Sequence, residues 1–230
     1  MPTARSIMEQ AGIVLHDEDH IRWPLAELAG WINLAVKAII LAKPSASSRS
    51  VVIELAEGTL QHVPQTGTPT PLSLLRIVRN IEQVGPPLVG GRIVNATPRA
   101  ALDAAEPNWH DPRRVRFRKE VRQYVFDENT PLEFYVYPGN DGTGLVEAAV
   151  AVLPAAVAPT GPEDHIDSWG AEIGLPEPYS EPALNYVLYR ALAKDDPPKS
   201  TAYYGQFASA IGLKIQVEGA SSPNARRTAT

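Results

Sequence analysis

The most regular hydrophobic pattern of the chain runs from Pro24 to about Lys43 and predicts a helix. At ~100° per residue, one side of this helix is aliphatic and carries Leu25, Leu28, Ala29, Ile32, Ala35, Val36, Ile39 and Ile40. The opposite side is also apolar and carries Trp31, Leu34, Ala38 and Leu41. Pro24 suits a first helical position and Pro44 cannot continue the helix. Because two sides are apolar, two covers are needed, and either another helix or another subunit would supply the second.

Two further helices are predicted near the C-terminal end. Ser180-Glu181-Pro182 is a helix start signal, and the stripe that follows consists of Leu184, Val187, Leu188, Ala191 and Leu192. A last helix is expected from Lys199 to about Gly212, and its buried side is expected to carry Tyr203, Phe207, Ala210 and Ile211. The short proline-rich link between them predicts an antiparallel pair. A short helix from Arg5 to Ala11 is expected near the N-terminus.

Alternation of apolar and polar residues predicts strands in the middle of the chain. Residues 51–55 and 59–63 flank Glu57-Gly58 and predict a hairpin. Residues 72–81 fit a strand or a helix, and residues 92–94 favour a strand. Thr97 and Pro98 predict the cap and first position of a short helix.

A stronger set of strands follows. Residues 121–126, 132–137 and 145–153 predict an antiparallel meander whose second turn is Gly139-Asn140-Asp141-Gly142. Residues 155–169 contain prolines and a glycine and are predicted to form a long surface loop. The predicted fold class is therefore α+β, with a helical bundle formed by the N- and C-terminal helices and an inserted antiparallel β-sheet domain.

This organisation divides the chain into three parts. Residues 1–48 and 180–212 are expected to form the bundle, and residues 49–179 the inserted β-rich domain. Residues 213–230 are expected to form an extended C-terminal tail, because their small and polar composition is typical of segments that do not fold alone.

Composition excludes some classes of function. The 230 residues are 44% hydrophobic and carry a net charge of -5, so the chain lacks the overall basic surface that general nucleic-acid binding needs. One local basic run exists, formed by Arg113, Arg114, Arg116, Arg118 and Lys119. The absence of cysteine removes disulfides and thiolate metal sites. We expect neither a secretion signal nor a membrane anchor.

Two groups of residues invite a chemical interpretation. His16 and His20 have a spacing that allows a shared metal, but the acidic residues between them fit a cap before the following helix better. Asn108 to Asp111 and Asp127-Glu128 contain the residue types of general acid–base catalysis, without a nucleophile or phosphate-loop motif. We therefore predict no catalytic residue, no metal ligand and no cofactor. Trp109 is predicted to be a buried loop anchor.

Several short segments, in this order and spacing, resemble one protein family. They are Arg22 to Leu28, Gly58 to Gln61 with Pro64, Arg79-Asn80, Leu102-Asp103 with Pro107 to His110, Phe134 to Pro138, and Tyr186 to Ala191 with Lys194-Asp195. From Ile21 to Gly212 the chain resembles the podovirus-type head-to-tail adaptor, or connector, proteins of short-tailed phages, which are similar to tail tubular protein A.

The resemblance implies a structural virion protein without catalytic residues or cofactor. Such proteins form a ring, typically of twelve subunits, between the portal protein and the tail nozzle protein. Duplex DNA passes through the ring without sequence-specific binding, so the ring is a conduit during ejection and a seal after packaging. The implied location is the neck or tail of the virion, after assembly in the host cytoplasm, with no membrane involved.

Two contact surfaces follow as expectations. The tail is expected to contact the portal. Its apolar candidates are Leu213, Ile215 and Val217, and its basic candidates, Arg226 and Arg227, are expected to meet acidic groups of the portal. Contacts between neighbouring subunits are expected from Trp31, Leu34 and Leu41. The alternative function is a structural or binding subunit of another oligomeric assembly, and an enzyme is the least favoured interpretation.

Overall fold

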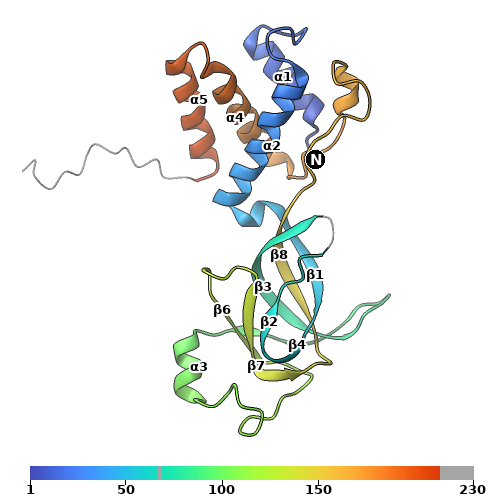
Figure 1. The fold of residues 1–230 in the computed structure, drawn as a ribbon, viewed down its shortest axis with the longest axis vertical. Coiled ribbons are helices and arrows are strands. Elements are labelled where there is room, and N and C mark those ends of the chain that lie inside the picture. The colour runs from blue at the N-terminus through green and yellow to red at the C-terminus, as the bar shows by residue number, and fades with distance from the viewer. Residues whose placement is uncertain (67–68, 213–230) are drawn as a thin grey trace, which may run out of the picture. The chain divides into compact units, whose positions relative to one another are not determined.

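The computed structural model describes residues 1–66 and 69–212 and has an α+β fold of helices with mainly antiparallel sheets (Figure 1). The chain forms two compact units. The helical unit contains Met1–Ala42, Val157–Glu172 and the described chain from residue 177 onward. The β unit contains Lys43–Ala156 and Ile173–Pro176.

The helical unit is built around four helices: α1 (Ala4–Leu15), α2 (Leu25–Ala42), α4 (Ser180–Leu192) and α5 (Pro197–Ala210). Two short helices, η2 (Ile166–Trp169) and η3 (Glu177–Tyr179), belong to the same unit. Within it, α4 contacts α1, α2 and α5. The Asp196 side chain caps α5 by accepting from the Lys199 N–H, so the short link after α4 starts the next helix at once.

Helix α2 agrees with the hydrophobic pattern. All eight residues of the predicted aliphatic side are buried, and Trp31 is buried with them. In the described chain, α2 is the helix whose length and apolar composition would suffice to cross a membrane, and half of it is buried within the fold. That burial is the ordinary state of a core helix, whose apolar side chains are covered by neighbouring helices.

The last helix differs from its prediction in the face that it buries. Phe207 and Ile211 are buried as expected, but Tyr203 is only partly buried and Ala210 is exposed. Ser200 and Ala208 are buried in their place. The buried face is therefore rotated relative to the predicted one, because the Ser200 hydroxyl donates to the Tyr189 carbonyl of α4 and fixes the side on which the helices meet.

The β unit consists of two four-stranded sheets. The first has the order β1-β8-β3-β4, formed by β1 (Ser48–Glu54), β8 (Leu145–Leu153), β3 (Thr70–Gln83) and β4 (Val89–Ile93). The second has the order β2-β7-β6-β5, formed by β2 (Glu57–His62), β7 (Glu133–Asp141), β6 (Gln123–Phe126) and β5 (Asn95–Ala96). Helix η1 (Pro44–Ser47) precedes β1, and α3 (Arg99–Ala105) follows β5.

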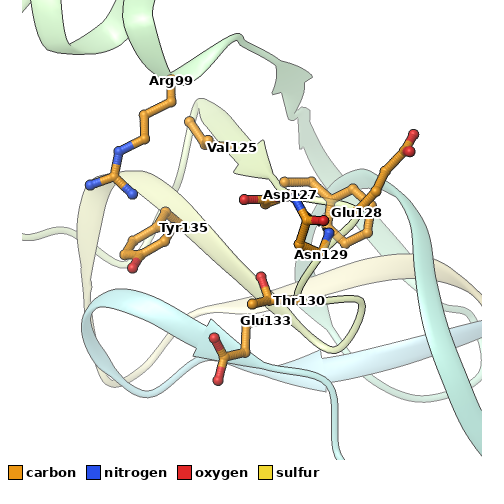
Figure 2. Close-up of a pocket in the computed structure, with 9 residues that line it drawn as sticks. Arg99, Val125, Asp127, Glu128, Asn129, Thr130, Glu133 and Tyr135 are labelled. Carbon is orange, nitrogen blue, oxygen red and sulfur yellow. Dashed lines mark hydrogen bonds between the residues drawn. The ribbon is translucent and has the colours of Figure 1, made fainter.

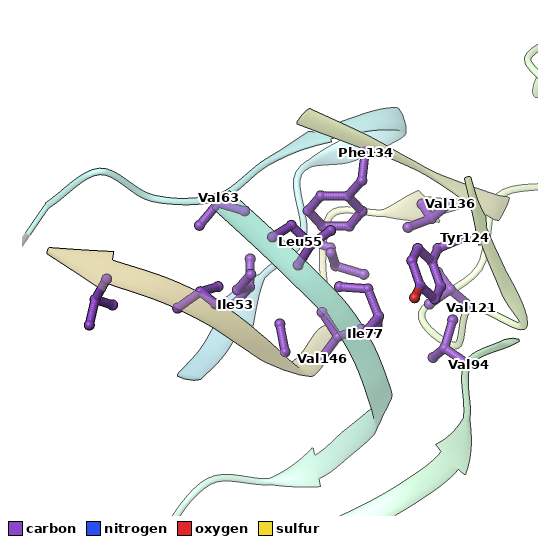
Figure 3. Close-up of a cluster of buried hydrophobic side chains, with 14 residues drawn as sticks. Ile53, Leu55, Val63, Ile77, Val94, Val121, Tyr124, Phe134, Val136 and Val146 are labelled. Atoms are coloured by element: carbon purple, nitrogen blue, oxygen red, sulfur yellow. The ribbon is translucent and has the colours of Figure 1, made fainter. Parts of the chain in front are cut away.

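The core of the β unit lies between the two sheets. Ile53, Ile77 and Val146 of the first sheet pack in one cluster with Phe134 and Val136 of the second (Figure 3). Alternate residues of β7 and β8 point into this cluster, as the period of two requires. Residues 72–81, which fitted either structure, thus belong to a strand.

The predicted hairpin of residues 51–55 and 59–63 is wrong, although both segments include strand residues. β1 pairs with β8, whereas β2 pairs with β7 in the other sheet. The Leu55 N–H donates to the Gly144 carbonyl, 2.9 Å away, and the buried Gln61 side chain bonds both the N–H and the carbonyl of Ala56. These bonds turn the chain at residue 56 and send β2 to the second sheet.

The predicted meander is correct only for its first two strands. β6 and β7 pair antiparallel, but β8 lies in the other sheet, between β1 and β3. β7 continues to Asp141 and so includes most of the expected turn, and the Asn140 side chain accepts from the N–H groups of Gly142 and Gly144. The chain therefore leaves the second sheet before β8 begins.

Of two smaller predictions, the first needs correction and the second needs one addition. Helix α3 begins at Arg99 with Pro98 in the cap position and has no side-chain cap, so Thr97 does not have the expected role. The loop of residues 155–169 is largely exposed, as predicted, although it contains η2 and the buried Trp169, whose indole N–H donates to the Glu163 carbonyl. That loop is attached to α2, because the Asn33 side chain bonds both the N–H and the carbonyl of Val157.

Candidate functional site

An aromatic pair at the start of α2 holds the end of α4. The rings of Trp23 and Trp31 are 5.6 Å apart, and Lys194 Nζ lies 4.9 Å from the first ring centroid and 5.5 Å from the second. The same Nζ is 2.6 Å from Glu27 Oε1. These cation–π and ionic contacts join the two helices. Trp31 is consequently 7% exposed, and little of it is available to a neighbouring subunit.

Asp17 organises the turn that leads into α2. Its carboxylate accepts from the backbone N–H groups of Ile21, Arg22 and Trp23. Burial by itself would raise the pKa of Asp17, but these hydrogen bonds, together with nearby His20, hold that pKa below its ordinary value of 3.8. The carboxylate is therefore ionised at neutral pH and holds the loop before α2, whereas the sequence interpretation expected a cap on the helix itself.

The two histidines of this segment do not share a helix face. Helix α1 ends at Leu15, and His16 is its C-cap in the left-handed region, with φ 55°. His20 also has a positive φ, of 52°. Among residues 1–66 and 69–212, no group of three or more metal-binding side chains occurs.

The exposed side of α2, which we call the α2 outer face, consists of Gly30, Leu34, Lys37 and Leu41. Leu34 is 41% exposed and Leu41 is 83% exposed. These four positions are spaced three to four residues apart, so they form one stripe along the helix. Leu34 and Leu41 are thus exposed on one face of α2, on either side of Lys37.

Trp109 is an anchor of the loop between α3 and β6, as predicted. It is fully buried, and its indole N–H donates to Asp103 Oδ1 at 2.8 Å. Its ring lies 3.7 Å from that of His110 and 5.9 Å, edge-on, from that of Tyr135. These contacts fasten the loop to α3 and β7.

A cleft of about 480 Å³ lies beside this anchor (Figure 2). Arg99 lies beside Tyr135 on one side, with its guanidinium 5.0 Å from the ring centroid. The turn of residues 127–130 lies on the other side. The cleft therefore combines an aromatic and cationic wall with an acidic turn.

The titratable groups of this region are engaged in structural bonds. The backbone N–H and side-chain amide of Asn129 both bond Asp127 and lower its pKa, so this carboxylate is ionised at neutral pH. Burial, and then the charge of Arg99, lowers the pKa of His110 despite an opposing effect of Asp103. The neutral imidazole bonds the Thr59 hydroxyl through Nδ1 at 2.7 Å. This arrangement favours a fixed loop over the acid–base pair considered from sequence.

The basic run lies on an exposed loop that is held at both ends. Arg113, Arg114, Arg116, Arg118 and Lys119 are all exposed. Trp109 anchors the start of the loop. At its end, the Arg118 N–H donates to the Gly139 carbonyl, and Asn140 donates to the carbonyls of Arg118 and Lys119.

Two buried asparagines are important for the β unit but were not singled out as structural residues from sequence. Asn80 exchanges hydrogen bonds with the backbone of Val121, and Asn140 bonds four backbone groups. Asn140 begins the segment Asn-Asp-Gly, which predicts a turn but not a buried side chain. No local pattern marks Asn80, because its partners lie far along the chain.

The expected portal contacts Leu213, Ile215, Val217, Arg226 and Arg227 lie outside the described residues.

Comparison with known proteins relates the chain to one family. A family model described as SU10 adaptor protein matches residues 2–227. No curated protein matches the chain.

Proposed function

We propose that this chain, which belongs to the SU10 adaptor protein family, is the subunit of a ring that joins the portal of a phage capsid to the tail. Membership identifies a phage adaptor protein and a virion component that associates with other virion proteins. It also supports a structural role over a catalytic one. The observation that carries the proposal is the match of the family to nearly the whole chain.

The finer features of the proposal come from the sequence resemblance. The ring has twelve subunits of the podovirus type, similar to tail tubular protein A, and lies in the neck between portal protein and nozzle protein. It assembles in the host cytoplasm. The helical unit acts as its bundle, the β unit acts as the inserted domain, and residues 213–230 act as the tail.

DNA passes through the centre of this ring during ejection, and the ring seals the packaged head. The net charge of -5 supports this role. Tight DNA binding comes from basic groups that neutralise phosphates and release counterions. A predominantly acidic channel wall would let duplex DNA slide past.

Particle imaging of the purified chain, with and without portal-bearing heads, tests the proposal. We expect rings with a central channel wide enough for duplex DNA, and density beneath the portal. A compact monomer or dimer that leaves the heads undecorated would contradict the adaptor role. It would favour a subunit of a different assembly.

The α2 outer face supplies the first prediction. Leu34→Asp is expected to prevent ring assembly while the monomer stays folded. Leu34 is 41% exposed, so an aspartate there stays hydrated in the monomer and loses its hydration only when a neighbouring subunit covers it. Size-exclusion chromatography with light scattering measures assembly, and circular dichroism measures folding. The control is Ile13→Asp, since Ile13 of α1 is also exposed, at 60%. Unfolding of the Leu34→Asp monomer would instead place this face in the core.

The tail supplies the second prediction, which rests on sequence alone. A chain ending at Gly212 is expected to fold and to lose portal attachment, because the apolar and basic anchors proposed for the portal follow that residue. Co-sedimentation with portal-bearing heads measures attachment. In the full chain, Arg226→Gln with Arg227→Gln is expected to weaken attachment without abolishing it, because Leu213, Ile215 and Val217 remain. Normal decoration of heads by the truncated chain would show that the tail is not the portal anchor.

A further inference from the structure

The turn of the β3–β4 hairpin is apolar and exposed. Val84, Leu88 and Val89 are 60%, 42% and 36% exposed. Residues 83–91 contain no charged side chain, although a projecting strand edge usually carries charges that prevent association. We call residues 84–89 the apolar tip. In Figure 1 the hairpin that carries it projects away from the sheet. An exposed apolar projection of this kind marks a docking element.

A groove of about 380 Å³ lies near the other end of the same sheet. Its walls are mainly aliphatic side chains and prolines, among them Val51, Val52, Val63, Pro71 and Val152. It includes β1, the edge strand opposite β4. We call it the β1 groove. Its size and apolar lining suit a few aliphatic side chains.

The tip and the groove also carry complementary charges. Arg49 is the single charged residue that lines the groove. Glu82 directly precedes the uncharged tip segment, and Arg92, which follows it, lies 3.8 Å from Glu120. Within the part of the chain that the structure describes, neither Arg49 nor Glu82 forms an ion pair. Each surface thus offers one uncompensated charge, of opposite sign.

A single copy cannot bring these two surfaces together. β3 begins at Thr70, beside the groove, and ends at Gln83, beside the tip. A strand rises about 3.3 Å per residue, so the tip and the groove are roughly 40 Å apart on one strand. The occupant of the groove must come from another molecule.

We propose that the apolar tip of one copy inserts into the β1 groove of the next copy, with Glu82 facing Arg49. Because two different surfaces meet, the contact is heterologous, and repeating it builds a closed ring or an open filament. The inference deepens the proposed function, on which it rests, by naming the surfaces through which the β units associate.

The absence of cysteine makes a direct test feasible. Two single-cysteine chains are prepared, Leu88→Cys in the tip and Val52→Cys in the groove, and are mixed under mild oxidation. We expect a disulfide-linked heterodimer in excess of both homodimers. The matched control replaces Leu88→Cys by Ile13→Cys, an exposed aliphatic position of α1. A cross-link no more abundant than in this control would overturn the proposal.

Charge reversal provides a second readout. Glu82→Arg in the tip chain, or Arg49→Glu in the groove chain, is expected to lower the cross-linked fraction about tenfold at low salt. Combining the two reversed chains is expected to restore it. Failure of the combination to restore the cross-link would also overturn the proposed pairing.

Particle imaging of the unmodified chain separates this inference from the proposed function. Rings without the tip–groove cross-link would overturn the inference and leave the adaptor ring standing. A cross-link in open chains that never close would support the contact and contradict the ring.

Discussion

Trp109→Ala is expected to lower the free energy of unfolding of the β unit by about 3–5 kcal/mol, the usual cost of removing a large buried aromatic side chain. Trp109 is fully buried, so the substitution leaves a cavity that its neighbours only partly fill. It also removes the indole N–H that donates to Asp103 and the ring contacts with His110 and Tyr135. The loop that carries the basic run would then be attached at one end only.

Urea denaturation followed by circular dichroism measures this loss. Trp109→Phe is the matched control, because it keeps an aromatic ring in the site and removes the hydrogen bond. We expect a smaller loss for phenylalanine, since much of the apolar volume is retained. Equal losses for the two variants would show that the hydrogen bond to Asp103, and not the packing, dominates.

Asn140→Ala is expected to destabilise the β unit by about 3 kcal/mol or more, because buried polar groups left without a partner cost about 1–3 kcal/mol each. Asn140 is fully buried. Its Oδ1 accepts from the N–H groups of Gly142 and Gly144, and its Nδ2 donates to the carbonyls of Arg118 and Lys119. Alanine replaces none of these four bonds, so both the turn after β7 and the end of the basic loop lose their support.

The same denaturation measurement, with hydrogen exchange of the Gly142 and Gly144 amides, tests this expectation. The matched control is Asn129→Ala, because Asn129 bonds only the exposed Asp127 turn through its side chain. Its loss is expected to stay within about 0.5 kcal/mol, as for most surface substitutions. A similar stability of the two variants would show that the four bonds of Asn140 are replaced by solvent.

The elements that sequence predicted well are those whose signals are local. Helix α2 has a clear hydrophobic period and a proline at each end, and these features act over one or two helical turns. Trp109 was correctly predicted to be a buried anchor because a large aromatic residue in a polar loop needs a covered site. The family resemblance was also available from sequence, because short segments kept their order along the chain, and the SU10 adaptor protein match agrees with it at the level of a phage adaptor.

Strand pairing could not be predicted in the same way. Residues 51–55 and 59–63 were expected to pair because they are adjacent in sequence, yet their partners are β8 and β7. The bond from Leu55 to Gly144 and the Gln61 side chain decide this, and the first of them joins groups far apart in the chain. Nothing in the local alternation of either segment contains that information.

Sequence by itself determined the α+β class, the positions of most helices and strands, and the membership of an adaptor family, because period, proline positions and segment order are properties of the chain. Only the tertiary structure decided which surfaces are free. It buried Trp31 against Trp23 and Lys194 but left Leu34 and Leu41 exposed. It also placed the apolar tip and the β1 groove at opposite ends of one strand. Exposure depends on which distant elements pack together, and that packing is set by long-range contacts that no local pattern encodes.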